Sequence, residues 1–188
     1  MKMKLIIVVL ALGLGGCAQG ARVDQMAAMP TTALPATSEL QHAIQLNSVT
    51  GGTTTNPLWM SKVGNPEFQA ALASSLGSAG LLANGEGRYR LDAKLEALRQ
   101  PMMGFDLTVH TQVHYTLTDT KLSKPVFDHQ IDSDFTATVG DAFMAVERLR
   151  LANEGSIKQN IRTFMDQMIA EFGSAPKVSV TGLRPPGG

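Results

Sequence analysis

The sequence predicts an α+β two-layer sandwich, in which a mostly antiparallel four-stranded sheet carries two helices on one face in the order β-α-β-β-β-α. Two observations lead to this prediction. Apolar and polar residues alternate along four segments, as they do in strands with one solvated face. Two other segments repeat their apolar residues at steps of three and four, which places them along one side of a helix. Elements with one apolar side bury it by packing helices on the sheet.

The first sixteen residues have the layout of an export signal. Lys2 and Lys4 precede an apolar run from Leu5 to Leu14, and two small residues follow. A membrane-spanning helix needs roughly 20 apolar residues, and this run is too short. We therefore expect the segment to be cleaved.

Leu14-Gly15-Gly16-Cys17 resembles the lipobox of bacterial lipoproteins and holds the only cysteine of the chain. The resemblance implies that Cys17 is acylated, with palmitate among the expected chains, and becomes the first mature residue. Ala18 after it implies sorting to the outer membrane, with the protein facing the periplasm. Several acyl chains hold a protein stably on a bilayer where a single chain does not. The alternative is a plain exported protein with an incidental cysteine.

Composition excludes some partner classes. Removal of the signal would delete two lysines and no acidic residue, which leaves a formal charge of about −2. A protein that binds nucleic acid carries a basic face, so nucleic acid is not expected as a partner. Aromatic residues make up 5% of the chain and methionine occurs 10 times, so the core should consist mainly of Leu, Val, Ala and Met.

The chain divides into four expected regions. These are a lipoprotein signal peptide over 1–16, a flexible tether over 17–40, a single α+β domain over 41–172 and a flexible tail over 173–188. The expected tether contains two prolines and keeps no sustained period of 2 or 3.6. The tail is also rich in proline and glycine, although a short apolar alternation leaves open an added edge strand.

The first strand and the first helix are marked by the residues at their ends. Ile44 and Leu46 alternate with polar neighbours, and Gly51-Gly52 ends this strand. Asn65-Pro66-Glu67 then places an N-cap side chain, a proline at the first helical position and an acid in the first turn. Gly80 is well placed to end the helix, because glycine readily adopts the left-handed conformation found there.

Three further strands follow. Alternation runs through residues 88–97 without a fault, through 105–117 with Phe105 on the apolar face, and through 127–135. His129 falls among the apolar positions of the last strand. We interpret it as a buried or half-buried histidine that bonds a backbone group, with a catalytic base as the alternative.

A long helical pattern runs from Gly140-Asp141 to about Phe172. Gly155 lies inside it, and a glycine within a helix costs roughly 1 kcal/mol relative to alanine. We expect this position to mark either a bend or a close backbone contact with the sheet.

No stretch of the domain has the pattern of an active site or a metal site. His110 and His114 lie four residues apart on one strand, which separates them by about 13 Å and prevents them from sharing a metal ion. Nucleophilic catalysis lacks a Gly-x-Ser-x-Gly elbow, and the cysteine is assigned to lipid. A phosphate-binding role for residues 51–56 matches no known fingerprint. No cofactor and no metal are expected, and we predict no enzymatic activity.

Two surfaces are candidates for binding a partner. The loop before the first helix contains the apolar side chains Leu58, Trp59 and Met60, and tryptophan is enriched at binding hot spots. The alternative is that Trp59 caps the edge of the core. The second surface is the polar face of the sheet, for which we single out Arg88, Arg90, His110 and His114.

With signal, tether and element order combined, the chain resembles small outer-membrane lipoproteins. The lipopolysaccharide-assembly lipoprotein LptE and the lipoprotein activators of penicillin-binding proteins have a similar outline, and residues 51–83 resemble the YajG group. The leading hypothesis is a non-enzymatic lipoprotein that binds an envelope protein or glycolipid and aids its assembly or regulation. A second is a carrier or sensor of a small apolar ligand held between helices and sheet. A hydrolytic enzyme is the third.

Overall fold

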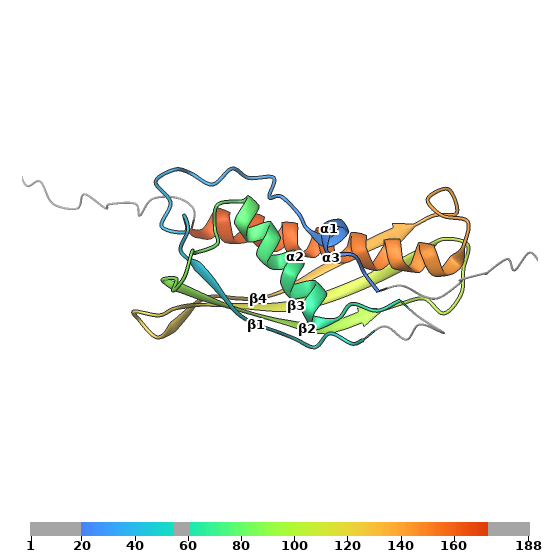
Figure 1. Cartoon of the computed structure of the whole chain (residues 1–188), viewed down its shortest axis with the longest axis horizontal. Coiled ribbons are helices and arrows are strands. Elements are labelled where there is room, and N and C mark those ends of the chain that lie inside the picture. Colours follow the sequence, from blue (N-terminus) through green and yellow to red (C-terminus); the bar gives the residue numbers. More distant parts are fainter. Residues whose placement is uncertain (1–19, 55–60, 173–188) are drawn as a thin grey trace, which may run out of the picture.

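The computed structural model describes residues 20–54 and 61–172 and confirms the α+β class (Figure 1). Its helices and strands follow one another in the order α1 (Val23–Met26), β1 (Ile44–Thr50), α2 (Asn65–Ser78), β2 (Tyr89–Arg99), β3 (Leu107–Asp119), β4 (Lys124–Ala137) and α3 (Ala145–Phe172). The predicted β-α-β-β-β-α order is present, with the short helix α1 added before it. Residues 1–16 and 173–188, the expected signal and tail, lie outside the described residues.

The four strands form one sheet in the order β1-β2-β3-β4, and this sheet is mixed. β2, β3 and β4 make the expected antiparallel meander, whereas β1 pairs with β2 in parallel from Ile44 opposite Tyr89. The parallel pair arises because α2 forms the crossover that returns the chain to the starting end of β1. The sequence predicted a mostly antiparallel sheet, but it did not indicate that β1 and β2 would form the parallel pair.

All three helices lie on the same side of the sheet (Figure 1). α3 covers β3 and β4, α2 lies over β1, and α1 packs on both of these helices. The core between the layers is closely packed. Tyr115 of β3 stacks on Phe164 of α3 with ring centroids 4.0 Å apart, and Phe127 of β4 meets the same ring edge-on.

The segment predicted as a flexible tether differs from that expectation where the structure describes it. Residues 20–40 lie along the helices, and Ala21, Met26, Ala28 and Leu40 are buried there. The Ala28 amide donates a hydrogen bond of 2.9 Å to the Ser75 hydroxyl of α2. Four apolar residues at irregular spacing produce no periodic pattern, so the sequence alone did not indicate that this segment packs.

Helix α2 begins and ends close to the predicted residues, with one difference in its capping. Gly80 has a φ of +71° and ends the helix as expected. Asn65 is the first helical residue, and Gly64 occupies the N-cap position. The Asn65 side chain instead accepts a hydrogen bond of 2.6 Å from the Gly52 amide. It therefore links the helix to the end of β1.

A bulge between Leu95 and Ala97 interrupts the alternation in β2. After the bulge, the residues that face the core are shifted by one position. Before the bulge the apolar residues are buried as predicted, and after it Leu98 packs inward while Ala97 is half-buried. The prediction of an uninterrupted period was wrong at this point. Phe105 was also assigned wrongly, because β3 begins only at Leu107 and Phe105 is exposed.

Helix α3 begins at Ala145, later than expected, and continues through Gly155 as one helix. A Cβ atom at Gly155 would lie 2.4 Å from the ring of Phe135 on β4. This glycine therefore marks the close contact with the sheet, which was one of the two predicted alternatives.

Candidate functional site

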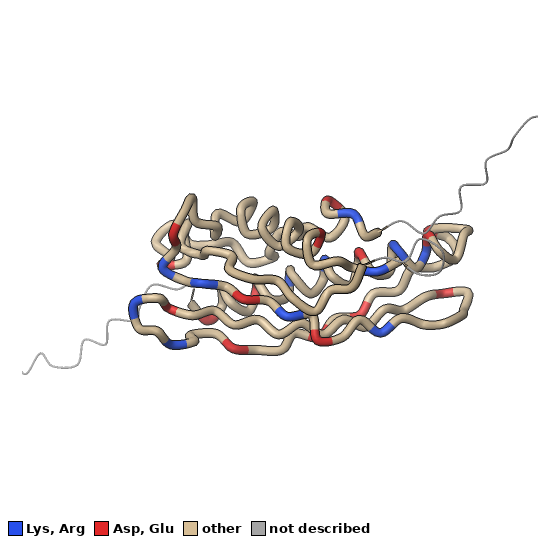
Figure 2. The backbone as a smooth tube through the Cα atoms, turned by 60° about the horizontal axis from the view of Figure 1, so that its bottom comes forward, with Lys and Arg blue, Asp and Glu red and all other residues tan. Residues whose placement is uncertain are grey.

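One face of the sheet carries no described helix, and its side chains are polar. Figure 2 turns this face toward the viewer and shows acidic and basic residues distributed along the strands. The face is formed by alternate residues of β2, β3 and β4, and most of the other alternate residues of these strands are buried against the helices. We name it the polar sheet face and define it by Arg90, Lys94, Glu96, His110, Gln112, His114, Thr116, Asp128, Gln130, Asp132 and Asp134.

Two histidine–aspartate pairs lie on the polar sheet face. His110 Nδ1 is 2.6 Å from Asp134 Oδ1, and the two residues are directly opposite in the β3–β4 register. His114 Nε2 is 2.7 Å from Asp128 Oδ1, which also accepts a hydrogen bond of 3.0 Å from the Thr116 hydroxyl. The hydrogen bonds from His114 and Thr116 lower the pKa of Asp128. Both carboxylates are therefore held in place by the neighbouring strand.

The structure brings three of the four predicted polar residues to this face, and leaves the fourth apart. Arg90, His110 and His114 lie on it. Arg88 precedes β2 and binds Asp119 at 3.0 Å and Glu39 at 2.6 Å at the end of the sheet. Its guanidinium thereby connects the N-terminal segment, residues 20–40, to the end of β3. Arg88 therefore lies apart from the other three residues, and its part in partner binding stays a prediction.

The two predicted histidines bind separate aspartates. Within residues 20–54 and 61–172, no group of three or more His, Cys, Asp or Glu side chains is arranged to hold a metal ion. His129 is exposed rather than buried, with Nε2 3.6 Å from Glu171 Oε1 and its ring against the edge of Phe127. The prediction of a buried or half-buried histidine that bonds a backbone group was wrong, because the His129 side chain is 50% exposed and lies beside the Glu171 carboxylate near the end of α3.

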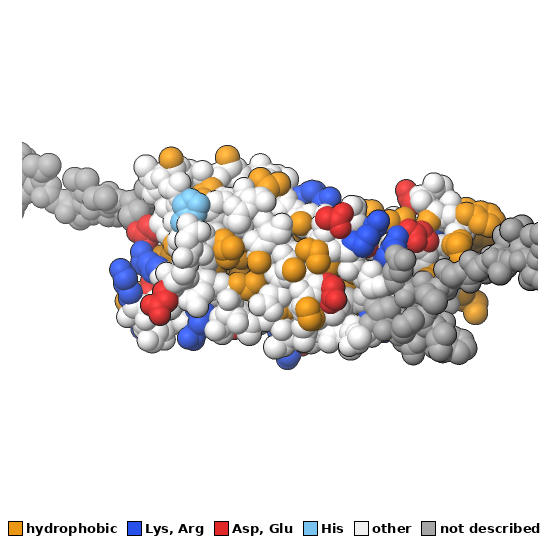
Figure 3. Space-filling model, viewed as in Figure 1, with side chains coloured by type: hydrophobic (Ala, Val, Ile, Leu, Met, Phe, Trp, Pro, Cys, Tyr) orange, Lys and Arg blue, Asp and Glu red, His pale blue; other side chains and the backbone are white. Residues whose placement is uncertain are grey.

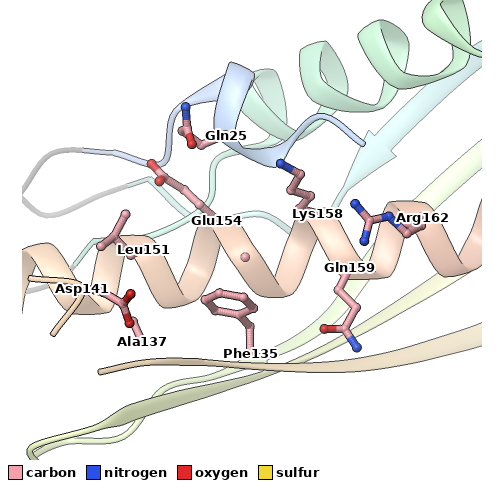
Figure 4. Close-up of a pocket in the computed structure, with 10 residues that line it drawn as sticks. Gln25, Phe135, Ala137, Asp141, Leu151, Glu154, Lys158, Gln159 and Arg162 are labelled. Carbon is pink, nitrogen blue, oxygen red and sulfur yellow. The ribbon is translucent and has the colours of Figure 1, made fainter. Parts of the chain in front are cut away.

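A groove of about 300 Å³ lies along the flank of α3 (Figure 4). Phe135 lies against Gly155 at its floor, and Lys158 and Arg162 line the wall beside α1. Glu154 at its edge forms an ion pair of 2.9 Å with Arg22. No local sequence pattern indicates this groove, because its walls come from α1, β4 and α3.

The structure also shows an exposed apolar cluster that the alternation and helical periods of the sequence do not indicate. Side chains gather at the end of the molecule where the β2–β3 and β4–α3 loops meet, and hydrophobic atoms lie at the surface there (Figure 3). We name this cluster the apolar tip and define it by Met102, Met103, Phe105, Phe143 and Met144, with exposed fractions of 96, 88, 85, 90 and 60%. The signal in the sequence was the occurrence of large apolar residues inside loop segments.

The predicted contact of Leu58, Trp59 and Met60 and the lipidation of Cys17 both lie outside the described residues. They stay predictions. None of the described helices combines the length and the apolar character that crossing a membrane requires.

Comparison with solved structures finds the same fold in several bacterial proteins. Protein XCC0632 of Xanthomonas campestris, assigned to family DUF330, aligns with a TM-score of 0.58 and 9% identity over 81% of this chain and 95% of its own. A candidate lipoprotein from Caulobacter crescentus aligns with a TM-score of 0.51 and 12% identity over 72% and 95%. The hypothetical protein CT253 of Chlamydia trachomatis gives 0.51 and 8% over 69% and 96%.

Comparison with protein-family models gives no match, and comparison with curated protein sequences gives none either. At identities of 8 to 12%, the structural likeness shows a shared fold. The chain therefore has a fold that also occurs in bacterial lipoproteins.

Proposed function

We propose that this chain is a non-enzymatic lipoprotein, anchored through Cys17 to the periplasmic face of the outer membrane, that binds another envelope component and aids its assembly or regulation. The partner is an envelope protein or a glycolipid. One observation carries the proposal: no segment within residues 20–54 and 61–172 covers the polar sheet face, while the opposite face lies beneath two helices and residues 20–40. The lipobox and the fold shared with lipoproteins support the anchor.

The chemistry of the polar sheet face suits recognition. Its side chains are ordered by cross-strand pairs such as His110 with Asp134, and pre-ordered side chains lose less entropy when a partner binds. Three aspartates line β4 on this face, Asp128, Asp132 and Asp134. A partner surface with basic groups would complement them and would be guided to the correct orientation.

The absence of enzymatic activity is part of the proposal. Among the described residues of the polar sheet face, each histidine is solvent-accessible and bonded to one aspartate. The predicted contact through Leu58, Trp59 and Met60, and the resemblance to the LptE and YajG groups, remain expectations that extend this proposal.

Site-specific photo-crosslinking in intact cells tests the proposal. A crosslinking amino acid at Gln112 or Gln130 would lie in the middle of the polar sheet face. The matched control is Gln69, an exposed glutamine of α2 on the opposite side. We expect positions 112 and 130 to give a defined crosslinked product with an envelope component. A crosslinking amino acid at position 59 tests the predicted loop contact separately. Equal products from position 69 would contradict the use of this face.

The groove along α3 favours a second function, the binding of a small ligand. Its volume of about 300 Å³ is at the lower end for small-molecule sites, and it combines the Phe135 ring with the cations Lys158 and Arg162. We therefore propose the flank of α3 as the ligand site instead of the space between helices and sheet, because side chains such as Tyr115 and Phe164 fill that space. Mass spectrometry of lipid extracted from the purified protein is the test, and loss of a bound lipid in Lys158→Glu would support it.

A further inference from the structure

The apolar tip is a built feature of the fold rather than a loose pair of loops. The Arg148 guanidinium is buried and donates hydrogen bonds to the backbone oxygens of Ala142 at 2.8 Å and Phe143 at 2.6 Å. Asp141 accepts from the amide and the hydroxyl of Thr138, and these bonds lower its pKa. The β4–α3 loop is thereby held in a shape that leaves the Phe143 side chain 90% exposed.

The second loop of the tip is joined to the first. The Val139 amide is 3.4 Å from the Asp106 carboxylate, and a hollow of about 280 Å³ lies between the loops, with Met102 and Met103 on one side and Val146 on the other. A small core cluster supports both loops from below and consists of Leu107, Val109, Ala137, Leu149 and Ala152. The tip therefore extends a packed core into solvent.

The N-terminal segment enters the domain close to the same end. Gln100 follows β2 directly, at the start of the β2–β3 loop, and donates a hydrogen bond of 2.8 Å to the Ser61 carbonyl. The next carbonyl, that of Lys62, accepts from the Ala21 amide at 3.4 Å. Arg22 is bound to Glu154, which is eight residues along α3 from Val146, or about 12 Å.

The length of the intervening chain limits how far the lipid attachment site lies from this point. Cys17 is three residues before Gly20, the first described residue, and three extended residues span at most about 11 Å. A domain docked from residue 20 onward is held near the bilayer. A lipid on Cys17 would consequently bring the membrane surface within reach of the apolar tip.

We propose that the apolar tip inserts into the leaflet that holds the lipid of Cys17, so that the domain is attached at two neighbouring points. This inference rests on the lipid anchor of the proposed function. The residues 101–105 and 142–146 carry no charge, whereas Asp106, Asp141 and Glu147 flank them. Uncharged Met and Phe side chains enter the acyl region readily, and the flanking carboxylates remain at the aqueous boundary.

The charges around the tip also define the lipid. Carboxylates at its boundary give no attraction to anionic headgroups, so insertion depends on apolar contact and proceeds in neutral phosphatidylcholine. Insertion at this end directs the strands away from the bilayer, because β2 ends and β3 begins at the tip. The polar sheet face is then left open to the periplasm along its length.

The full lipidated chain, purified from membranes and reconstituted into phosphatidylcholine vesicles, allows a direct test. Because lipid would block the single cysteine, Met103→Cys or Phe143→Cys supplies the only free thiol for an environment-sensitive nitrobenzoxadiazole probe. The control positions are Leu122→Cys in the β3–β4 turn, at the other end of the strands, and Gln69→Cys on α2. We expect the probes at positions 103 and 143, and not those at the control positions, to show blue-shifted emission. Lipids with brominated acyl chains should also quench the probes at positions 103 and 143 several-fold more strongly.

Additional variants and a mass measurement distinguish a failure of the tip insertion from a failure of the lipid anchor. Phe143→Glu should reduce the quenching of a probe at position 103 several-fold, and the matched Leu122→Glu should leave it unchanged. Water-like emission at the tip positions would overturn the inference, and so would a blue shift without quenching, which would indicate contact between protein copies. Mass spectrometry of the N-terminal peptide reports the anchor separately: an unlipidated Cys17 refutes the anchor, whereas a lipidated chain with a solvated tip refutes only the insertion.

Discussion

At the scale of single residues, the contact between α3 and β4 depends on the size of residue 155 and on the hydrogen bonds of residue 160. Gly155 lets the Phe135 ring approach the helix backbone. Five residues further along α3, fully buried Asn160 donates to the Ile131 carbonyl at 2.7 Å and accepts from the Tyr115 hydroxyl at 2.9 Å. Burial raises the pKa of Tyr115, because the phenolate would be separated from water. Both positions therefore contribute specific contacts between α3 and the sheet.

Gly155→Ala should destabilise the protein even though alanine is the better helix former. The new methyl group would lie 2.4 Å from the Phe135 ring, and overpacking costs about 1–3 kcal/mol, more than the roughly 1 kcal/mol gained in helix propensity. Urea unfolding measures the change. The matched control is Gly77→Ala in α2, where the nearest atom is 3.9 Å away and a gain in stability is expected. Equal stability of the two variants would contradict the close contact.

Asn160→Ala should lower the free energy of unfolding by about 2–4 kcal/mol, because it leaves a buried hydroxyl and a buried carbonyl without their partner. Tyr115→Phe removes the hydroxyl itself and should have a smaller effect. Thermal or urea unfolding of both variants and of their double mutant measures the coupling. Additive losses would show that the two side chains do not interact.

At the scale of elements, the N-terminal segment is attached by a carboxylate on α3. Asp166 accepts hydrogen bonds from the amides of Thr31 at 2.7 Å and Thr32 at 3.0 Å and from the Thr31 hydroxyl at 2.7 Å. Partial burial opposes ionisation, but these hydrogen bonds outweigh it and lower the pKa of Asp166. The segment is thus bound to the helices by polar as well as apolar contacts.

Acid should weaken this attachment. A carboxyl group with a lowered pKa in the folded state stabilises the fold above its unfolded pKa of about 3.9, and this contribution is lost as the pH falls through the folded value. We expect the protection of the amides of residues 31 and 32, measured as the exchange rate relative to the intrinsic rate at the same pH, to fall below about pH 4. Asp166→Asn should reduce this protection already at pH 7, and Asp132→Asn on the polar sheet face serves as the control. Unchanged exchange in Asp166→Asn would refute the attachment.

At the scale of the whole molecule, the two faces of the sheet divide stability from binding. The helix side contains the buried contacts, and the polar sheet face contains exposed pairs, each worth little to stability. Changes on the polar sheet face should therefore affect partner binding while the fold is kept.

Asp132→Lys should reduce crosslinking from position 112 several-fold, because it reverses a charge in the centre of the polar sheet face, where Asp132 is opposite Gln112. The unfolding temperature should change little, since exposed substitutions usually alter stability by about 0.5 kcal/mol or less. Gln69→Lys on α2 adds one positive charge on the other side and should leave the crosslink intact. An equal loss in both variants would indicate that net charge rather than this face matters.

The sequence by itself determined the class of fold and most of its elements. The strict alternation in β3 and in the first part of β2 indicates which residues are buried, because the side-chain period of a strand is two. Gly80 marked the end of α2, and the polar positions of Arg90, His110 and His114 followed from the same alternation.

Only the tertiary structure decided the features that depend on contacts between distant segments. The parallel pairing of β1, the docking of residues 20–40, the bulge after Leu95 and the separate position of Arg88 have no local period. The apolar tip belongs here as well, because two loops that are about forty residues apart in the chain meet at one end of the sheet. Local patterns report how each segment divides its side chains between core and solvent, whereas long-range packing determines which surfaces meet.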